Sequence, residues 1–246
     1  MIYNLLILHR VGEYENSLFS DVSVNNFSLL LDTILKSGCK VSSIKSAHNA
    51  LEDTIVLTFD DGWMSHYITV YPLLKKHNIS ATFFITTDFI GRKDYVTWEQ
   101  LSEMIEGGMD IGSHSVTHPN FTKIDKIEAF KEAFDSKKIL EERLGVKVNS
   151  FSFPGGYYDK KTVSLVKDCG YVTICNSNPG VNRHLKGGMV LRNSINAITK
   201  EHDFNSIIQP SKLLIYKKKM FHMSRIILRM VIGEKFYLKL RMLILK

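Results

Sequence analysis

Two pairs of polar residues have the types and the spacing needed for metal-assisted hydrolysis. Asp60 and Asp61 end the apolar run in TIVLTFDDGW, and His114 and His118 stand four residues apart in SHSVTH. Two histidines at this spacing can face one ion from a single turn, and a carboxylate from another segment completes a set of three ligands. Three protein ligands leave open positions for water and substrate. We therefore predict that Asp61, His114 and His118 hold a divalent metal.

The second carboxylate has a different predicted task. Asp60 would take a proton from the attacking water while Asp61 holds the metal. Gly62 would turn the chain so that both side chains reach one cavity, and the cation would offset the cost of placing two acids together. A DD dipeptide alone is more often a turn or a helix cap, and an HxxxH alone is more often a solvated helix face. Their joint occurrence at predicted strand ends favours the metal site.

The elements that must position these residues alternate between strands and helices. Strands are predicted over residues 3–8, 55–59, 81–86, 109–112, 148–153, 171–174 and 189–191. Helices are predicted over 25–36, 67–76 and 127–144. One further helix begins at a capping box at residues 97–100, and another ends at Gly170. This alternation indicates an α/β fold with a mainly parallel sheet, whose chemistry lies at the C-terminal ends of the strands. A barrel and an open doubly wound sheet give the same alternation, so the pattern leaves both open.

Length and composition narrow the class of protein. The 246 residues suffice for one large α/β domain or for two small ones. Three cysteines without CxxC spacing indicate neither a disulfide framework nor a zinc ribbon. The sequence has no apolar run of about 18 residues to span a bilayer, and its N-terminus lacks the basic region and cleavage site of a signal peptide. We therefore expect a cytoplasmic protein.

The positive charge is concentrated at the C-terminal end. Residues 212–246 hold seven Lys, three Arg and one Glu, a net charge of +9, whereas the whole chain carries +7. Residues 1–211 are therefore slightly acidic, which excludes a uniformly basic nucleic-acid-binding domain. We predict a catalytic domain over 1–211 and a basic amphipathic helical tail over 212–246.

The tail separates its charged and apolar residues into stripes. One predicted helical stripe carries Lys218, His222, Arg225 and Arg229, and another carries Met220, Met223, Ile227 and Val231. A second apolar segment, which carries Lys239 and Arg241, follows at 235–245. Two interpretations stay open: a peripheral membrane anchor that uses both stripes, or an apolar stripe packed on the body or on a partner with the basic face in solvent.

Three motifs together resemble one known family. Thr58 to Gly62 reads TFDDG, residues 113–118 read SHSVTH, and residues 153–156 read FPGG. These resemble the motifs of polysaccharide deacetylases, the NodB-homology group of carbohydrate esterase family four, and the resemblance extends from about His9 to Arg192. It implies a distorted (β/α) barrel, narrower than the eight-stranded form, with a divalent metal at the strand ends. It also implies hydrolysis of an N-acetyl group on a hexosamine within a glycan.

The resemblance also implies roles for individual residues. Asp60 would be the general base, while Asp61, His114 and His118 would hold the metal. The backbone N–H of Gly155 would stabilise an oxyanion beside the metal. Zinc is the first expectation for the ion, with iron, cobalt or nickel as alternatives.

Two departures from the family pattern lead to further candidates. The position where the family carries an Arg that orients the base is Ser152 here, and Arg192 is a candidate to supply the missing guanidinium. The late L-x-H motif, whose His protonates the leaving amine, is also missing. Leu8-His9-Arg10-Val11 is similar to a motif of a circularly permuted subgroup that acts in exopolysaccharide synthesis, so His9 becomes the candidate acid. We expect His66, one turn beyond Gly62, on a helix surface.

The predicted function is a metal-dependent hydrolase that removes N-acetyl groups from an amino sugar of a polysaccharide or lipid-linked glycan precursor. One alternative keeps the metal chemistry and acts on O-acetyl esters or on a non-sugar amide. A second alternative is a noncatalytic glycan-binding module on the same fold, against which Asp60 and both histidines argue.

Overall fold

The computed structural model describes residues 1–15, 17–233 and 236–237. Its strands form one sheet in the order β8-β7-β6-β5-β4-β3-β1-β9, with β2 beside β3. Every pairing between these strands is parallel. The strands are β1 (Tyr3–Leu8), β2 (Lys40–Ser42), β3 (Thr54–Phe59), β4 (Thr82–Ile85), β5 (Asp110–Ser113), β6 (Ser150–Ser152), β7 (Thr173–Cys175), β8 (Met189–Val190) and β9 (Arg192–Ser194).

The sheet nearly closes into a barrel because one short segment pairs with both of its edges. β8 pairs with β7 at one edge, and β9 pairs with β1 at the other edge. Only Leu191 separates these two strands, so the single strand predicted at 189–191 is in fact two strands that bridge the gap. The implied (β/α) barrel is confirmed, and the open doubly wound alternative is wrong.

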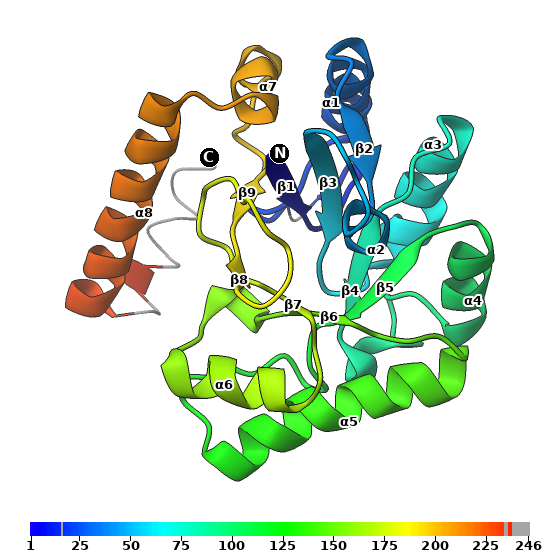
Figure 1. The fold of residues 1–246 in the computed structure, drawn as a ribbon, viewed down its shortest axis with the longest axis vertical. Helices are drawn as coiled ribbons and strands as arrows, with labels where there is room; N and C mark the ends of the chain where they lie inside the picture. Colours follow the sequence, from blue (N-terminus) through cyan, green and yellow to red (C-terminus); the bar gives the residue numbers. More distant parts are fainter. Residues whose placement is uncertain (16, 234–235, 238–246) are drawn as a thin grey trace.

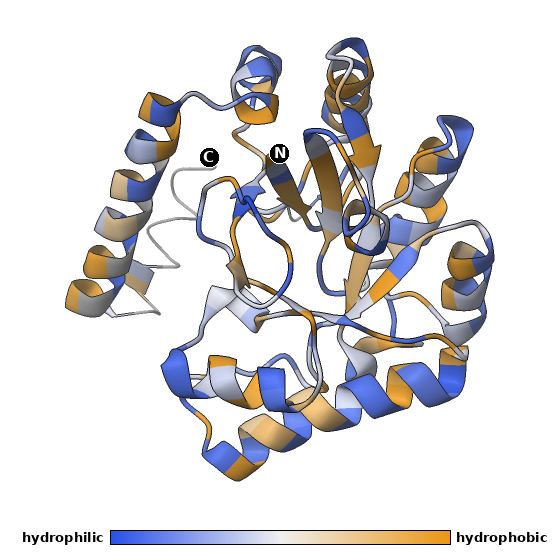
Figure 2. Cartoon of the chain, viewed as in Figure 1, coloured by the Kyte–Doolittle hydropathy of each residue, from blue (hydrophilic) through white to orange (hydrophobic). Residues whose placement is uncertain are grey.

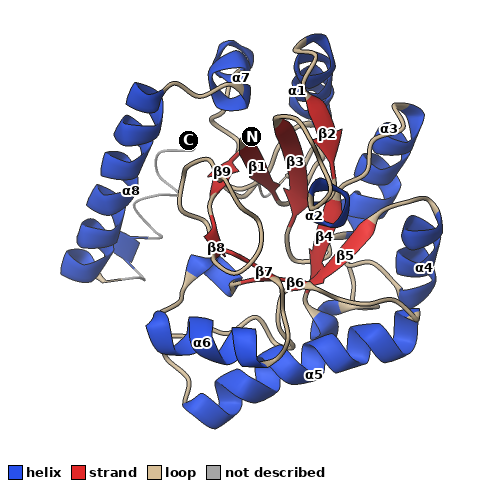
Figure 3. Ribbon diagram, in the orientation of Figure 1, coloured by secondary structure: helices blue, strands red, loops and turns tan. Residues whose placement is uncertain are grey.

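Helices surround the strands on the outside (Figure 1; Figure 3). The α-helices are α1 (Val24–Lys36), α2 (Ile44–Ala47), α3 (Tyr71–Lys76), α4 (Trp98–Glu106), α5 (Lys126–Leu144), α6 (Lys160–Asp168), α7 (Glu201–Ile208) and α8 (Lys212–Ile232). A π-helix at His66–Val70 and short 3₁₀ turns at Thr87–Phe89 and Pro154–Gly156 complete the described helices. The predicted capping box at the start of α4 is present, with Thr97 accepting from the Gln100 N–H and Gln100 accepting from the Thr97 N–H.

The core lies between the strands and the helices that cover them. All residues of β1 and β3 are buried, because strands covered on both faces need continuous apolar runs instead of alternation. Figure 2 shows this as mostly hydrophobic strands inside helices of mixed character. On α5 the small side chains of Ala129, Ala133 and Ser136 face inward, whereas Phe130 and Phe134 are exposed.

The tail helix α8 presents its apolar stripe to the outside. The outward residues, each more than half exposed, are Leu213, Tyr216, Met220, Met223, Ile227 and Val231. On the other side, Arg225 Nε donates to the Tyr237 hydroxyl at 2.7 Å and Arg229 Nη1 donates to the Tyr157 hydroxyl at 3.0 Å. Among the described residues this stripe therefore does not pack on the body, and its packing on a partner stays open. The side chains of Lys218 and His222 and the segment 238–246 lie outside what the structure describes.

Candidate active site

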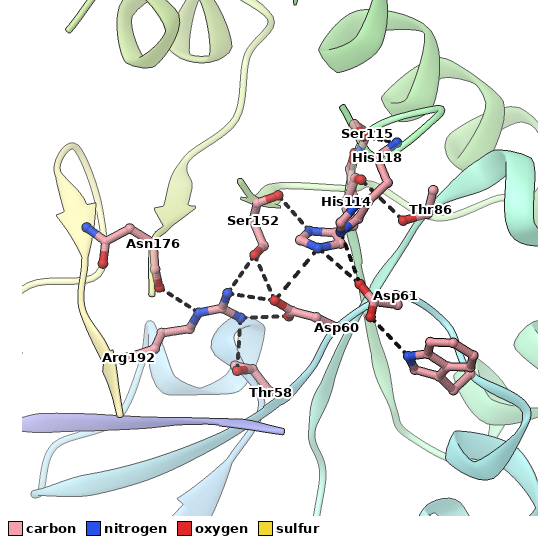
Figure 4. A network of polar contacts seen from close by, with 12 residues as sticks. Thr58, Asp60, Asp61, Thr86, His114, Ser115, His118, Ser152, Asn176 and Arg192 are labelled. Carbon is pink, nitrogen blue, oxygen red and sulfur yellow. Dashed lines mark hydrogen bonds and ion pairs between the residues drawn. The ribbon is translucent and has the colours of Figure 1, made fainter. Parts of the chain in front are cut away.

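The candidate site lies where the strands end, and the chain turns sharply there. Asp60 and Asp61 follow β3, His114 follows β5, and Ser152 is the last residue of β6 (Figure 4). Asp61 has φ 80° and Gly62 has φ 83°. A left-handed backbone at a non-glycine residue is uncommon and costs free energy. This turn aims both carboxylates at one point, which an extended strand would not do.

Three of the predicted residues come together as a possible metal-ligand set. One ligand atom from each of Asp61, His114 and His118 lies within 4.8 Å of the others. Asp61 Oδ1 is 3.3 Å from His114 Nε2 and 3.4 Å from His118 Nε2. The ring Nδ1 of His114 lies 2.7 Å from the carbonyl oxygen of Ser152. Because that carbonyl only accepts, Nδ1 carries a proton, which leaves Nε2 as the nitrogen that can bind a cation.

The chemistry of this set fits a divalent cation. Asp61 Oδ1 is buried and accepts no hydrogen bond among the described residues. A buried carboxylate oxygen without a hydrogen-bond donor, close to two imidazole nitrogens, is costly unless a cation lies between them. Burial raises the pKa of Asp61, but the His114 and His118 rings outweigh it and hold that pKa well below the usual value. Asp61 is therefore ionised at neutral pH and available as a ligand.

Asp60 lies beside this set and is held by the Arg192 guanidinium. Arg192 Nη1 donates to Asp60 Oδ1 and Nη2 donates to Asp60 Oδ2, both at 2.7 Å. The other three N–H groups of the guanidinium reach Ser152 Oγ at 2.7 Å, Thr58 Oγ1 at 3.2 Å and the Asn176 carbonyl at 2.9 Å. All five donors are thus used (Figure 4). The side chain is fully buried. Sequence reasoning placed Arg192 as a candidate near the base, and the structure brings it into bidentate contact.

The charge state of Asp60 follows from this environment. Burial raises the pKa of Asp60, but the positive charge of Arg192, helped by His114, outweighs burial and lowers it. The carboxylate is therefore ionised at neutral pH, as a group that accepts a proton must be. Ser152 Oγ also donates to Asp60 Oδ2 at 3.2 Å, so the residue that replaces the family Arg still contacts the same carboxylate.

His9 lies next to the aspartates because β1 and β3 are neighbours in register. Leu8 is paired with Phe59, and the Asp60 N–H donates to the Leu8 carbonyl at 3.0 Å. Both strands therefore deliver their next residue, His9 and Asp60, to the same edge. His9 Nδ1 is buried without a hydrogen-bond partner in the described part of the chain.

The expectation for His66 is wrong. His66 is fully buried on the π-helix, and its Nε2–H donates to the His9 carbonyl oxygen at 2.9 Å. Burial lowers the pKa of His66 to about 4, so the ring is neutral over most of the physiological range. Its ring also packs against Phe59 and Phe83. The contacts that bury His66 come from the end of β1, from β3 and from β4, which are distant in the sequence or on other elements, so no local signal in the sequence marks this position.

Gly155 lies in the turn that follows β6, at the same edge as Ser152. It has φ +59°, and a Cβ on it would lie 2.7 Å from the Tyr157 ring. Both facts require glycine at this position. Gly155 itself is exposed on this side of the barrel.

Comparison with known proteins identifies the family. A family model described as polysaccharide deacetylase matches residues 47–174, just over half of the chain. The chain belongs to the polysaccharide deacetylase family. The matched residues include Asp60, Asp61 and both candidate histidine ligands. His9 and Arg192 lie outside the match.

Two curated relatives show the extent of the sequence similarity. YxkH of Bacillus subtilis (strain 168) is 33% identical over 129 residues, which are 52% of this chain and 46% of YxkH. The peptidoglycan-N-acetylmuramic acid deacetylase PdaA of the same strain is 31% identical over 129 residues, 51% of this chain and 47% of PdaA. The matched region thus spans less than half the length of these relatives.

Solved deacetylase structures share the fold over more of the chain. The Streptococcus pyogenes deacetylase PplD in complex with acetate has a TM-score of 0.77 at 23% identity, covering 85% of this chain and 99% of PplD. IcaB from Ammonifex degensii has a TM-score of 0.74 at 23% identity, covering 85% of this chain and 96% of IcaB. At this level of identity the likeness concerns the fold. It extends the common architecture beyond the 47–174 region.

Proposed function

We propose that this protein is a metal-dependent hydrolase that removes N-acetyl groups from amino sugars of a polysaccharide or glycan precursor. The observation that carries the proposal is the convergence of Asp61, His114 and His118 beside a second carboxylate, Asp60, that Arg192 holds in place. Membership of the deacetylase family supports the same reaction. PdaA is named for a peptidoglycan sugar, so peptidoglycan fragments are candidate substrates together with exopolysaccharides and lipid-linked sugars.

Each residue of the site has a separate role in the proposed reaction. Asp61, His114 and His118 would hold a divalent cation, which would supply Lewis acidity and lower the pKa of water to about 7. Asp60 accepts the proton of the attacking water, while Arg192 and Ser152 fix the direction of its carboxylate. The Gly155 N–H donates to the oxygen that gains negative charge. His9 protonates the nitrogen that departs, and the products are acetate and a free amine.

Acetate release from a panel of substrates tests the proposed reaction. We expect the purified protein to contain a divalent metal and to release acetate from N-acetylhexosamine polymers, oligomers or lipid-linked sugars, with the release lost after chelation and restored by metal. Preferential release from O-acetyl esters or non-sugar amides would favour the esterase or amidase alternative. A metal-loaded protein that binds glycans but hydrolyses none of these substrates would instead be the noncatalytic module.

His9 has a testable role as the acid. Replacing His9 by Ala should lower kcat by about 10²-fold, the lower end for general acid catalysis, with the metal content unchanged because His9 is outside the ligand set. Steady-state kinetics and metal analysis measure the two quantities. His202→Ala is the matched control, since the His202 side chain on α7 is 74% exposed. Full activity of His9→Ala would remove this residue from the mechanism.

The tail helix supports a second proposal, peripheral contact with an anionic membrane. The outward stripe of α8 is apolar and exposed, and Lys217 and Lys219 are exposed on the same helix. This arrangement suits an interfacial helix whose apolar face enters the headgroup region while lysines contact anionic lipid.

The Arg229 contact to Tyr157 joins α8 to the turn that contains Gly155. Contact with a bilayer would thus bring the rim of the site toward a lipid-linked glycan. Among the described residues, no helix is long and apolar enough to cross the bilayer itself.

Flotation of the full chain with liposomes tests this contact. We expect the wild-type protein to float with vesicles that contain anionic phosphatidylglycerol. It should not float with vesicles of neutral phosphatidylcholine alone. Ile227→Glu, in the outward stripe, should abolish flotation by placing a charge in the apolar face. Ser206→Glu makes a like change in charge on the exposed surface of α7 and should float like the wild type. Equal flotation of both variants, or none for the wild type, would discard the membrane contact.

A further inference from the structure

Trp63 makes a contact with Asp61 that the reaction scheme does not use. Its indole Nε1–H donates to Asp61 Oδ2 at 2.9 Å. The other oxygen, Oδ1, is the atom that lies 3.3 Å and 3.4 Å from the two histidine nitrogens. The two oxygens of one carboxylate therefore have different partners: Oδ2 accepts from the indole, and Oδ1 faces the ligand set.

The indole is itself held in place by rings and charges from other loops. Trp63 stacks on Tyr95 with ring centroids 4.5 Å apart and an angle of 22° between the planes. The Arg10 guanidinium lies over the indole at 5.1 Å and over Tyr14 at 3.9 Å. Asp21 accepts from Arg10 Nε at 2.9 Å and from Nη2 at 2.6 Å. The indole therefore has little freedom to turn away from Asp61.

The backbone reinforces this arrangement. Trp63 and Tyr95 form an antiparallel bridge, the Val96 N–H donates to the Gly62 carbonyl at 3.0 Å, and the Met64 N–H donates to the Asp94 carbonyl at 2.8 Å. The residues on either side of Trp63 are thus tied to one loop. This rigidity matters because Asp61 itself has a left-handed backbone, φ 80°, and its side-chain direction depends on the turn.

We propose that Trp63 is a positioning residue for the metal: by occupying Oδ2, it presents Oδ1 of Asp61 as the single ligand oxygen. A carboxylate without such a partner can rotate about its Cβ–Cγ bond and exchange its oxygens, so part of the binding free energy goes into ordering it. Residues that hydrogen-bond to metal ligands typically change metal affinity by about 10–100-fold when they are replaced. The inference rests on the metal site of the proposed function and is measured without any turnover.

The chain offers a closely matched pair of substitutions. It has two tryptophans, Trp63 and Trp98. Both are partly buried, and each lies under an arginine, Arg10 at 5.1 Å and Arg143 at 5.4 Å. Trp98 lies on α4 and packs against the hydrophobic core. Replacing either by Phe removes an indole N–H and keeps a ring, so only Trp63→Phe changes the hydrogen bond to the ligand.

The test measures Zn²⁺ affinity by competition with a chromophoric chelator for the full chain and both variants. We expect Trp63→Phe to bind Zn²⁺ about 10–100-fold more weakly than the wild type, and Trp98→Phe to bind it equally well. The visible absorption of bound Co²⁺ should also change in Trp63→Phe alone, because the carboxylate then binds differently. Thermal unfolding of the metal-free proteins checks that each variant is folded, and Trp63→Leu repeats the test with neither ring nor donor.

The outcomes separate this inference from the proposed function. Equal Zn²⁺ affinity and equal Co²⁺ spectra for wild type and Trp63→Phe would overturn the role of Trp63 and leave the deacetylase proposal as it was. Equal weakening by Trp63→Phe and Trp98→Phe would also overturn it, because a general loss of packing would then be the cause. A wild-type chain that binds neither Zn²⁺ nor Co²⁺ would overturn the metal site. Both the role of Trp63 and the proposed metal-dependent function would then be wrong.

Discussion

Replacing Asp60 by Asn should lower kcat/KM by about 10²–10⁴-fold, the range that a general base supplies, while the metal content stays unchanged. Asn has nearly the same shape but does not accept a proton at neutral pH. The ligand atoms of Asp61, His114 and His118 are untouched by the change. Acetate release at saturating metal and metal analysis on the same sample measure the two quantities.

A matched substitution separates the base from the general effect of losing a carboxylate. Asp110 is the first residue of β5, at the opposite end of the barrel, and accepts from Thr82 Oγ1 at 2.8 Å and from the Lys45 N–H at 3.3 Å. Asp110→Asn should keep turnover near the wild-type value. If Asp60→Asn were fully active, or if it lost its metal while still folded, the assignment of Asp60 as base would be wrong.

Replacing Arg192 by Met should lower the free energy of unfolding by about 3–5 kcal/mol, because it leaves a buried carboxylate without its partner. Such a loss is a large part of the about 5–15 kcal/mol that stabilises a typical domain. Turnover should fall as well, since Asp60 loses the two donors that fix its direction, while the metal content of the folded protein stays unchanged. Denaturant unfolding and metal analysis measure these effects, and Arg143→Met, on an exposed arginine, is the control.

The double variant Asp60→Asn/Arg192→Met gives the sharpest version of this test. It removes both charges, so it should be more stable than Arg192→Met alone, in which one charge stays buried and unpaired. Equal losses for the single and double variants would show that the unpaired charge of Asp60 is not the cause of the destabilisation.

The effect of Arg192→Met on the free energy of unfolding should depend on pH in a direction that the pKa of Asp60 sets. In the wild type the pKa of Asp60 is lowered, so its stabilising contribution is present above the pKa of the unfolded chain and is lost as the pH falls through the lowered value. In Arg192→Met the burial of Asp60, which raises the pKa, is no longer outweighed by the guanidinium. Protonation then favours the folded state of the variant. The stability difference between Arg192→Met and the wild type should therefore narrow on acidification, and a constant difference would argue against this cause.

Local patterns in the sequence predicted much of the fold and the centre of the site. Apolar runs between glycine and capping signals placed β1, β3 and α4 within one or two residues of their observed bounds. The same pattern predicts that the functional residues lie at the ends of strands, because parallel strands deliver their C-terminal residues to one edge of the sheet. Asp61, His114 and His118 could therefore be grouped without a structure, although they come from two strands. Only the family resemblance predicted that the barrel closes, because the pairing of β9 with β1 joins residues that are far apart along the chain.

The sequence by itself determined the alternating α/β elements, the two motifs that deliver the aspartates and histidines to one edge, and the concentration of basic residues after residue 211. Only the tertiary structure decided that Arg192 pairs with Asp60, that His66 is buried against His9, and that the apolar stripe of α8 faces outward. The physical reason is the same in each case. Periodicity and capping depend on neighbours within a few residues, whereas these contacts join positions separated by a strand crossing or depend on which way a helix is turned, and their free energy comes from burial that no local pattern encodes.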